Sequence, residues 1–256
     1  MSDWNPELYL KFKKERNQPI YDLISGVEIS NVKRIIDIGC GPGNSTAMLK
    51  EKWPEAEIIG IDFSDSMIEK AKTDYPDIQF AVGDASKDLA YLGKFDIVFA
   101  NASLQWIPDH ESLLPRLFKL VSSNGAFAAQ IPQFDNMPIS RTIRMTAALP
   151  KWKDYFVEFK EPLTFCPDEQ YYNFLSADCS KIRIWNTKYY HVMSSHFDIL
   201  EMISSTGMKP YLDKLPSELH QEFSNDILEG IKKDYPTQSD SKVLFPFERF
   251  FFIAYR

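Results

Sequence analysis

The sequence has little cysteine and no long hydrophobic run. Only three cysteines occur along the chain, at Cys40, Cys166 and Cys179. They are widely spaced and form no CxxC or CxH pair, so neither a disulfide framework nor a zinc site is predicted, and we expect no bound metal. The longest strongly apolar run, residues 250–255, is far shorter than the roughly 20 residues that a membrane helix needs. The amino terminus lacks the basic start and apolar stretch of a secretion signal, so we expect a cytoplasmic protein.

The sequence also lacks an excess of basic residues. Its 29 Lys and Arg stand against 36 Asp and Glu, a formal net charge of −7. This balance argues against a nucleic-acid binder with a broad basic face, although it does not exclude a small anionic substrate. Hydrophobic residues make up 44% of the chain, which excludes a disordered protein. The length of 256 residues suits one large domain with an ample core.

Short apolar runs alternate with helical patterns over the first half of the chain. Five of these runs predict buried strands, at residues 34–39, 57–62, 78–84, 95–101 and 125–131. A helix begins after the N-cap Ser64, and a second spans 110–121 with leucines on one side. Alternating strands and helices predict βαβ units and a parallel sheet, the α/β class.

This alternation stops after residue 131. Residues 133–180 contain four prolines and many aromatic side chains, which favour a cap insertion over a solvated linker. Beyond it, strands are expected at 181–193 and 247–256, and helices at 195–206 and 216–234.

A glycine-rich segment, Asp37-Ile38-Gly39-Cys40-Gly41-Pro42-Gly43-Asn44, leaves the first strand and enters a helix. Its glycines allow a tight turn and the close approach of a ligand. The spacing GxGxG differs from the GxGxxG of dinucleotide binders. Asp62 ends the second strand, where a carboxylate can accept the ribose hydroxyls, and Asp84 follows the third, where it can accept from an adenine amino group. Residues 101–106 follow the fourth strand, so all these loops meet at the carboxyl edge of a parallel sheet.

The acidic residues at this edge bear on the cofactor. A dinucleotide carries a pyrophosphate, which is disfavoured beside carboxylates. Asp37 suits a cation better. S-adenosylmethionine carries a sulfonium, an ammonium, a ribose and an adenine, and no phosphate, so the sequence favours it over NAD.

These motifs, with Gly83-Asp84-Ala85, resemble those of the class I S-adenosylmethionine-dependent methyltransferases. The blocks at 4–10, 39–46, 100–106 and 108–110 resemble the bacterial trans-aconitate 2-methyltransferase family. Tyr189-Tyr190-His191, Thr206-Gly207 and the surroundings of Arg249 extend the likeness to the carboxyl terminus, and residues 133–180 show the least.

The resemblance implies a doubly wound, Rossmann-like sheet of seven strands, mostly parallel with an antiparallel C-terminal strand. It implies a single domain, 1–256, made of a helical lid (1–30), a cofactor-binding core (31–132), the cap insertion (133–180) and a C-terminal part that completes the sheet (181–256). The reaction implied is methyl transfer to a carboxylate of trans-aconitate or a related polycarboxylate, by a monomer without nucleic-acid or membrane partners.

The resemblance also assigns candidate site residues. Those for the cofactor are Asp37, Gly39, Gly41, Asn44, Asp62, Phe63, Met67, Asp84, Ala85, Asn101, Ala102 and Trp106. For the substrate, a tri-acid requires cations or neutral donors in its pocket, and the candidates are Tyr9, Arg16, Arg144, Tyr189, Tyr190, His191 and Arg249. Packing is the simpler role for Met67, and a structural role for His191. No catalytic side chain is assigned, because a carboxylate is already a nucleophile at pH 7 and positioning can supply most of the rate.

Three alternatives stay open at this point. The acid could be a malonyl thioester on a carrier protein, although no basic rim for such a partner is evident. An NAD-dependent reductase would need the spacing GxGxxG, which the sequence lacks. A non-catalytic S-adenosylmethionine-binding protein is the third.

Overall fold

A computed structural model describes residues 13–256. The chain divides into two compact units, which are described separately. The larger unit comprises Lys13–Pro132, Leu163–Thr187 and Arg249–Arg256. The described part of the smaller unit comprises Gln133–Pro162 and Lys188–Glu248.

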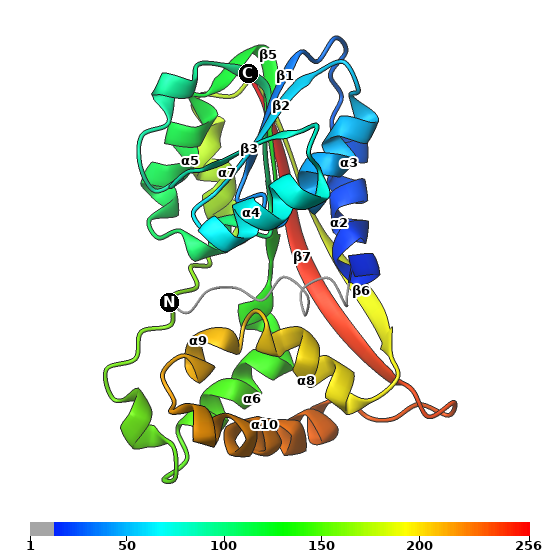
Figure 1. Ribbon diagram of the computed structural model, residues 1–256, viewed down its shortest axis with the longest axis vertical. Helices are drawn as coiled ribbons and strands as arrows, with labels where there is room; N and C mark the ends of the chain where they lie inside the picture. Colours follow the sequence, from blue (N-terminus) through cyan, green and yellow to red (C-terminus); the bar gives the residue numbers. More distant parts are fainter. Residues whose placement is uncertain (1–12) are drawn as a thin grey trace. The chain divides into compact units, whose positions relative to one another are not determined.

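A seven-stranded sheet organises the fold, with the strand order β3-β2-β1-β4-β5-β7-β6 (Figure 1). Strands β1 to β5 pair in parallel, and β7 runs antiparallel to β5. The strands are β1 (Arg34–Ile38), β2 (Glu57–Asp62), β3 (Gln79–Val82), β4 (Phe95–Asn101), β5 (Val121–Pro132), β6 (Lys181–Met193) and β7 (Val243–Tyr255). The predicted fold class is confirmed, since this is a mostly parallel sheet with an antiparallel C-terminal strand.

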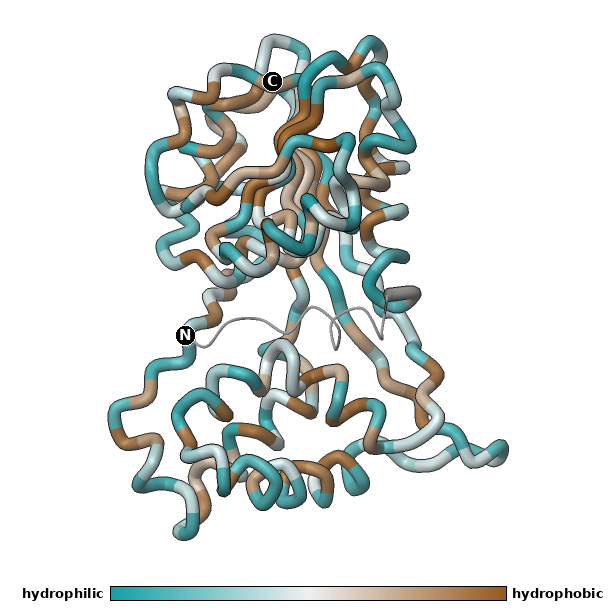
Figure 2. The backbone as a smooth tube through the Cα atoms, viewed as in Figure 1, coloured by the Kyte–Doolittle hydropathy of each residue, from teal (hydrophilic) through white to brown (hydrophobic). Residues whose placement is uncertain are grey.

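Helices cover both faces of the sheet in the larger unit. α2 (Lys13–Gly26) and α3 (Asn44–Lys52) lie on one face, and α5 (His110–Phe118) and α7 (Asp168–Ser176) on the other (Figure 1). Hydrophobic residues concentrate on the strands between these layers (Figure 2). On the α5 side, Phe127 of β5 and Phe252 of β7 pack edge to face, 5.1 Å apart. Because helices cover both faces of these strands, their sequences are nearly continuous apolar runs.

The local predictions agree with the structure to within a few residues. α4 (Asp65–Asp74) begins after Ser64, whose Oγ accepts the backbone N–H of Met67. Strand β7 begins at Val243, four residues earlier than predicted. The helix expected at 216–234 consists of a short 3-10 turn, η5 (Ser217–Leu219), followed by α10 (His220–Asp234). The larger unit also contains two 3-10 turns. They are η1 (Ala90–Leu92), which precedes β4, and η2 (Leu104–Trp106), which follows it.

The smaller unit is mainly helical. Its remaining elements are η3 (Phe134–Asn136), α6 (Pro138–Ala147), η4 (Lys153–Phe156), α8 (His196–Ser204) and α9 (Lys209–Leu212). Aromatic side chains form its interior: the rings of Trp152 and Phe223 meet edge to face at 5.2 Å, and Phe156 contacts Phe223 and Tyr211. This accounts for the aromatic richness of the segment after residue 132.

The compact units do not follow the boundaries expected for a cap at 133–180. Residues 133–162 belong to the smaller unit, but 163–180 belong to the larger one. The physical reason is α7, because its Tyr171 and Leu175 are buried in the sheet core with the residues of α5.

Within residues 13–256, no helix is both long and apolar enough to cross a membrane. The same described range contains no cluster of three or more His, Cys, Asp or Glu side chains that could hold a metal ion.

Candidate active site

The glycine loop after β1 has a backbone that demands glycine. Gly39, Gly41 and Gly43 all have positive φ, at 69°, 55° and 91°. The Gly39 N–H donates to the Ile61 carbonyl at 2.8 Å, which ties the loop to β2. A Cβ at Gly39 would lie 2.3 Å from the Cβ of Ser103, whereas a Cβ at Gly41 would have no atom within 4 Å. Gly39 is therefore required by packing, while Gly41 faces open space in which a ligand can approach the backbone.

Asp37 lies at the end of β1 and is completely buried. Its Oδ2 accepts hydrogen bonds from Ser45 Oγ at 2.6 Å and Thr46 Oγ1 at 2.7 Å, both on α3. Its Oδ1 is buried and has no donor among residues 13–256. Burial raises the pKa of Asp37 to about 6, although the two hydroxyls act in the opposite direction. The carboxylate therefore needs a donor or a cation that the described chain does not supply.

Asp62 at the end of β2 holds the glycine loop in place. Its Oδ2 accepts the Gly41 N–H at 2.9 Å, and its Oδ1 accepts the Ser64 N–H at 3.0 Å. A carboxylate has about four lone-pair sites and can accept more than two hydrogen bonds. The next residue, Phe63, is 55% exposed, which leaves its ring face accessible beside this carboxylate.

The other cofactor candidates around β3 and α4 differ in their exposure. Asp84 is exposed, and its hydrogen bonds from Ser86 lower the pKa of its carboxyl group. Ala85 is buried in the sheet core, and Met67 is buried on α4. Asn44 is buried as well: its Oδ1 accepts from Tyr75, and its Nδ2 has no acceptor in the described chain.

The loop after β4 has a strained backbone. Ala102 has a φ of 53°, a conformation that a residue other than glycine rarely adopts. Two hydrogen bonds hold it there: its N–H donates to the Gln130 carbonyl at 2.9 Å, and its carbonyl accepts from Gln105 Nε2 at 2.8 Å. Asn101 Oδ1 and Gln105 Oε1 are buried without a donor among the described residues. Trp106, partly exposed, closes the turn. Strain and unmet acceptors together indicate a ligand-binding loop.

His110 supports this loop from behind. Its Nε2 lies 2.9 Å from the Leu104 carbonyl and its Nδ1 lies 3.0 Å from Tyr171 Oη. Because a carbonyl can only accept, the proton is assigned to Nε2, and Nδ1 accepts from the tyrosine. Burial lowers the pKa of His110, which keeps the ring neutral. His110 therefore holds η2 in place through the Leu104 carbonyl.

Two substrate candidates of the larger unit are buried arginines. Arg249 on β7 is 4% exposed and donates from Nη1 to Gln130 Oε1 at 3.1 Å. Arg16 on α2 is 8% exposed. Tyr9 lies outside the described residues.

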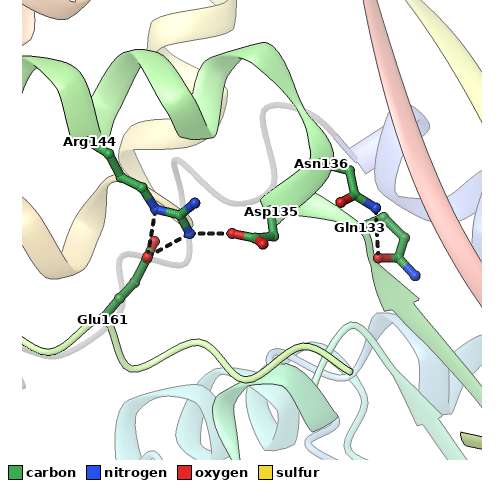
Figure 3. Close-up of polar contacts among 5 residues, drawn as sticks. All are labelled: Gln133, Asp135, Asn136, Arg144 and Glu161. Carbon is green, nitrogen blue, oxygen red and sulfur yellow. Dashed lines mark hydrogen bonds and ion pairs between the residues drawn. The ribbon is translucent and has the colours of Figure 1, made fainter. Parts of the chain in front are cut away.

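The remaining substrate candidates belong to the smaller unit. Arg144 on α6 forms ion pairs with Asp135 of η3 and with Glu161, the latter at 2.7 Å (Figure 3). Its guanidinium is therefore already occupied by two carboxylates. Among the β6 residues, Tyr190 is 61% exposed, while Tyr189 stacks on the buried His191 at 6.4 Å. His191 contacts Phe245 and Phe247, as in an aromatic core.

Several residues of the site were not predicted. Ser45, Thr46 and Ser103 hold the glycine loop and its neighbours through side-chain hydroxyls, which are too common in sequences to stand out. Gln130 did carry a signal, because it is the one amide in the buried run 125–131, whose other residues are apolar. Such a side chain requires hydrogen-bond partners.

The comparisons with known proteins agree with this geometry. A family model described as a methyltransferase domain matches residues 29–196. The chain therefore belongs to the methyltransferases, and the family predicted from the motifs is confirmed. It is also 39% identical to trans-aconitate 2-methyltransferase of Escherichia coli O7:K1 over 257 residues, covering all of this chain and 99% of the relative.

Solved structures show the same fold. Phosphoethanolamine N-methyltransferase 2 of Haemonchus contortus, in complex with S-adenosyl-L-methionine, matches with a TM-score of 0.58 and 19% identity, over 97% of this chain and 56% of that chain. The YcgJ protein of Bacillus subtilis matches with a TM-score of 0.56 and 12% identity, over 94% and 98%. At these identities the structures support the fold alone. The family match favours a methyltransferase over the NAD-dependent reductase.

Proposed function

We propose that this methyltransferase transfers a methyl group from S-adenosylmethionine to a carboxylate of trans-aconitate or a related small polycarboxylate. The products are the monomethyl ester and S-adenosylhomocysteine. The observation that carries the proposal is the 39% identity to trans-aconitate 2-methyltransferase over essentially the full length of both chains.

The chemistry of the carboxyl edge fits this cofactor. Asp37 Oδ1, Asn101 Oδ1 and Gln105 Oε1 are buried acceptors that lack donors in the described chain. An ammonium group supplies such donors and also compensates the negative charge of Asp37. A pyrophosphate would bring further negative charge and acceptors only. The orphaned acceptors therefore support a cationic, phosphate-free cofactor.

Neighbouring residues suit the rest of the cofactor. Asp62, whose carboxylate can accept several hydrogen bonds, would hold the ribose hydroxyls. The exposed ring of Phe63 would lie against the adenine, and Asp84 at its rim would accept from the amino group. Gly41, with open space beyond its Cα, would allow the methionine end to approach the backbone.

The reaction needs little from the protein beyond positioning. When bound, S-adenosylmethionine supplies an electrophilic methyl group on a sulfonium. A carboxyl group with a pKa near 4 is ionised at neutral pH, so no general base has to remove a proton. The residues of the chain bind and align the acid, keep water away from the reacting atoms and hold the loop after β4 in its strained form.

Methyl-transfer assays test the substrate class. Purified protein is incubated with methyl-labelled S-adenosylmethionine and, separately, trans-aconitate, citrate, isocitrate, itaconate and a malonyl thioester. We expect label to pass to trans-aconitate with the highest kcat/KM. Transfer to the malonyl thioester alone would identify a different acid, and transfer to none despite cofactor binding would refute the proposal.

Asp62→Ala tests the cofactor assignment by calorimetric binding of S-adenosylhomocysteine. We expect the Kd to rise more than tenfold, because the variant loses both the ribose acceptor and the brace on Gly41. The exposed Asp77, replaced by alanine in the same way, is the matched control and should bind as the parent does. An unchanged Kd for Asp62→Ala would show that the ribose assignment is wrong.

A further inference from the structure

Gln130 lies among the residues of the carboxyl edge on one face of the sheet. In the strand register it is paired with Asn101 of β4 and Phe251 of β7, and Pro132 of β5 is paired with Arg249. Paired residues share a face, and so do residues two apart on one strand. Asn101, Gln130 and Arg249 therefore project from the same face, within the larger unit.

The hydrogen bond from Arg249 fixes the orientation of the Gln130 amide. A guanidinium can only donate, so the group 3.1 Å from Arg249 Nη1 must be the amide oxygen. The amide nitrogen, Nε2, is then fixed on the opposite side of the group. This nitrogen is buried and has no acceptor among residues 13–256.

An unmet donor at this position is costly. Gln130 is 0% exposed, and its neighbours on the same face of β5, Ala126 and Ala128, are small, apolar and equally buried. A buried amide N–H without an acceptor costs about 1–3 kcal/mol, whereas an apolar side chain would carry no such cost. A buried amide N–H that is fixed in orientation and lies beside a guanidinium is matched by an anionic oxygen from outside the described chain.

We propose that Gln130, oriented by Arg249, binds a carboxylate of the substrate that is not methylated. This inference rests on the proposed function and adds a specificity-determining residue to it. Donors lower the nucleophilicity of the oxygen they bind, so this pair suits an anchoring carboxylate better than the reacting one. It makes the enzyme prefer acids with two or three carboxylates over monocarboxylates.

Gln130→Glu tests the anchor. The substitution is isosteric and keeps an oxygen toward Arg249, now as an ion pair, while Nε2 becomes a negatively charged oxygen. We expect KM for trans-aconitate to rise at least tenfold at pH 7, kcat to change less, and the Kd for S-adenosylhomocysteine to stay within twofold. The loss should diminish at low pH, where the introduced carboxyl group is protonated and can donate again. Gln79→Glu, on the exposed start of β3, is the matched control and should leave all three constants unchanged.

A merely structural amide would give a different result. In that case Gln130→Glu changes the melting temperature but leaves KM for trans-aconitate and its pH dependence as in the parent, which overturns the anchor while the proposed function stands. Calorimetry with trans-aconitate and citrate on the complex with S-adenosylhomocysteine separates the remaining outcomes. Binding without methylation refutes the proposed function and keeps the anchor, provided Gln130→Glu weakens that binding. A parent protein that binds no polycarboxylate refutes both.

Discussion

Two polar regions of this protein differ in whether their side chains find hydrogen-bond or ion-pair partners within the described chain. At the carboxyl edge of the larger unit, Asp37, Asn101 and Gln130 each bury an atom without a hydrogen-bond partner in the described chain. In the smaller unit, Arg144 meets two carboxylates, and Asn136 donates to Gln133 at 3.4 Å (Figure 3). The first region is buried, whereas the Arg144 side chain is 43% exposed.

The difference separates a binding site from a structural contact. Buried polar atoms without partners cost about 1–3 kcal/mol each, so their concentration at one edge implies that a ligand supplies the missing groups. Partly exposed ion pairs such as those of Arg144 contribute little, roughly 0–1 kcal/mol, and require no ligand. Unmet hydrogen-bonding capacity, rather than charge alone, marks the functional region.

The largest effect is expected from the glycine loop. Gly39→Ala places a Cβ 2.3 Å from the Cβ of Ser103 and should lower the free energy of unfolding by about 3 kcal/mol or more. Gly41→Ala meets no protein atom, so it should cost only about 1 kcal/mol of backbone strain yet weaken cofactor binding more than tenfold. Thermal unfolding and calorimetric binding measure the two quantities. Equal effects of both variants on stability would contradict the assignment of Gly41 to the ligand.

Asp37→Asn should weaken cofactor binding by about tenfold or more, because the neutral amide no longer attracts the ammonium. In the parent protein the folded-state pKa of about 6 lies above the unfolded value near 3.8. The stability from this group is therefore complete below about pH 4 and is lost as pH rises through about 6, in total roughly 3 kcal/mol.

Asp37→Asn should not show this decrease in folding stability. In the parent protein, the affinity for the cofactor should increase as pH rises through about 6. Unfolding and binding measured from pH 4 to 8 check both. If affinity in the parent is independent of pH over this interval, Asp37 is not the cation's partner. Asp77→Asn, at the exposed position that precedes β3, is the matched control.

A smaller effect is expected at His110, which supports the loop from behind. Its folded-state pKa is lowered, so the unfolded chain binds more protons around and below pH 6.5. The stability from neutral His110 is present above about pH 6.5 and is lost as the pH falls below it. His110→Gln should reduce this acid sensitivity, measured by urea unfolding at pH 5 and pH 7.5. Glu111→Gln, at an exposed position of α5, is the matched control and should leave the acid sensitivity unchanged. An unaltered difference between the two pH values would exclude His110 as its source.

The smallest effect is expected at Arg144. Arg144→Met should lower the free energy of unfolding by less than about 1 kcal/mol and change KM for trans-aconitate less than threefold, because its charge is already paired. Steady-state kinetics and urea unfolding provide the measurements. A tenfold rise in KM would show that Arg144 contacts the substrate, as its charge led us to predict, and that its ion pairs with Asp135 and Glu161 are not merely structural.

The fold class and the positions of the glycine loop and Asp62 could be predicted from short segments of sequence. Strand β1, the glycine loop and Asp62 at the end of β2 are recognisable because apolar runs, glycine spacing and strand ends are local patterns. The substrate side did not follow in this way. The sequence does not distinguish the three candidate arginines, Arg16, Arg144 and Arg249. They differ only in their burial and in the side chains that surround them in the fold.

Local sequence patterns are enough to predict the alternation of strands and helices, the glycine loop and the acidic residues that follow the strands. Which polar atoms lack partners within residues 13–256 depends instead on contacts between segments that are far apart in the sequence. Arg144 finds its carboxylates 9 and 17 residues away, and Arg249 meets Gln130 across 119 residues. Local patterns arise from the periodicity of a single element, whereas hydrogen-bond satisfaction depends on which elements the fold brings together, so only the folded chain distinguishes the arginine that orients Gln130 from the one held by Asp135 and Glu161.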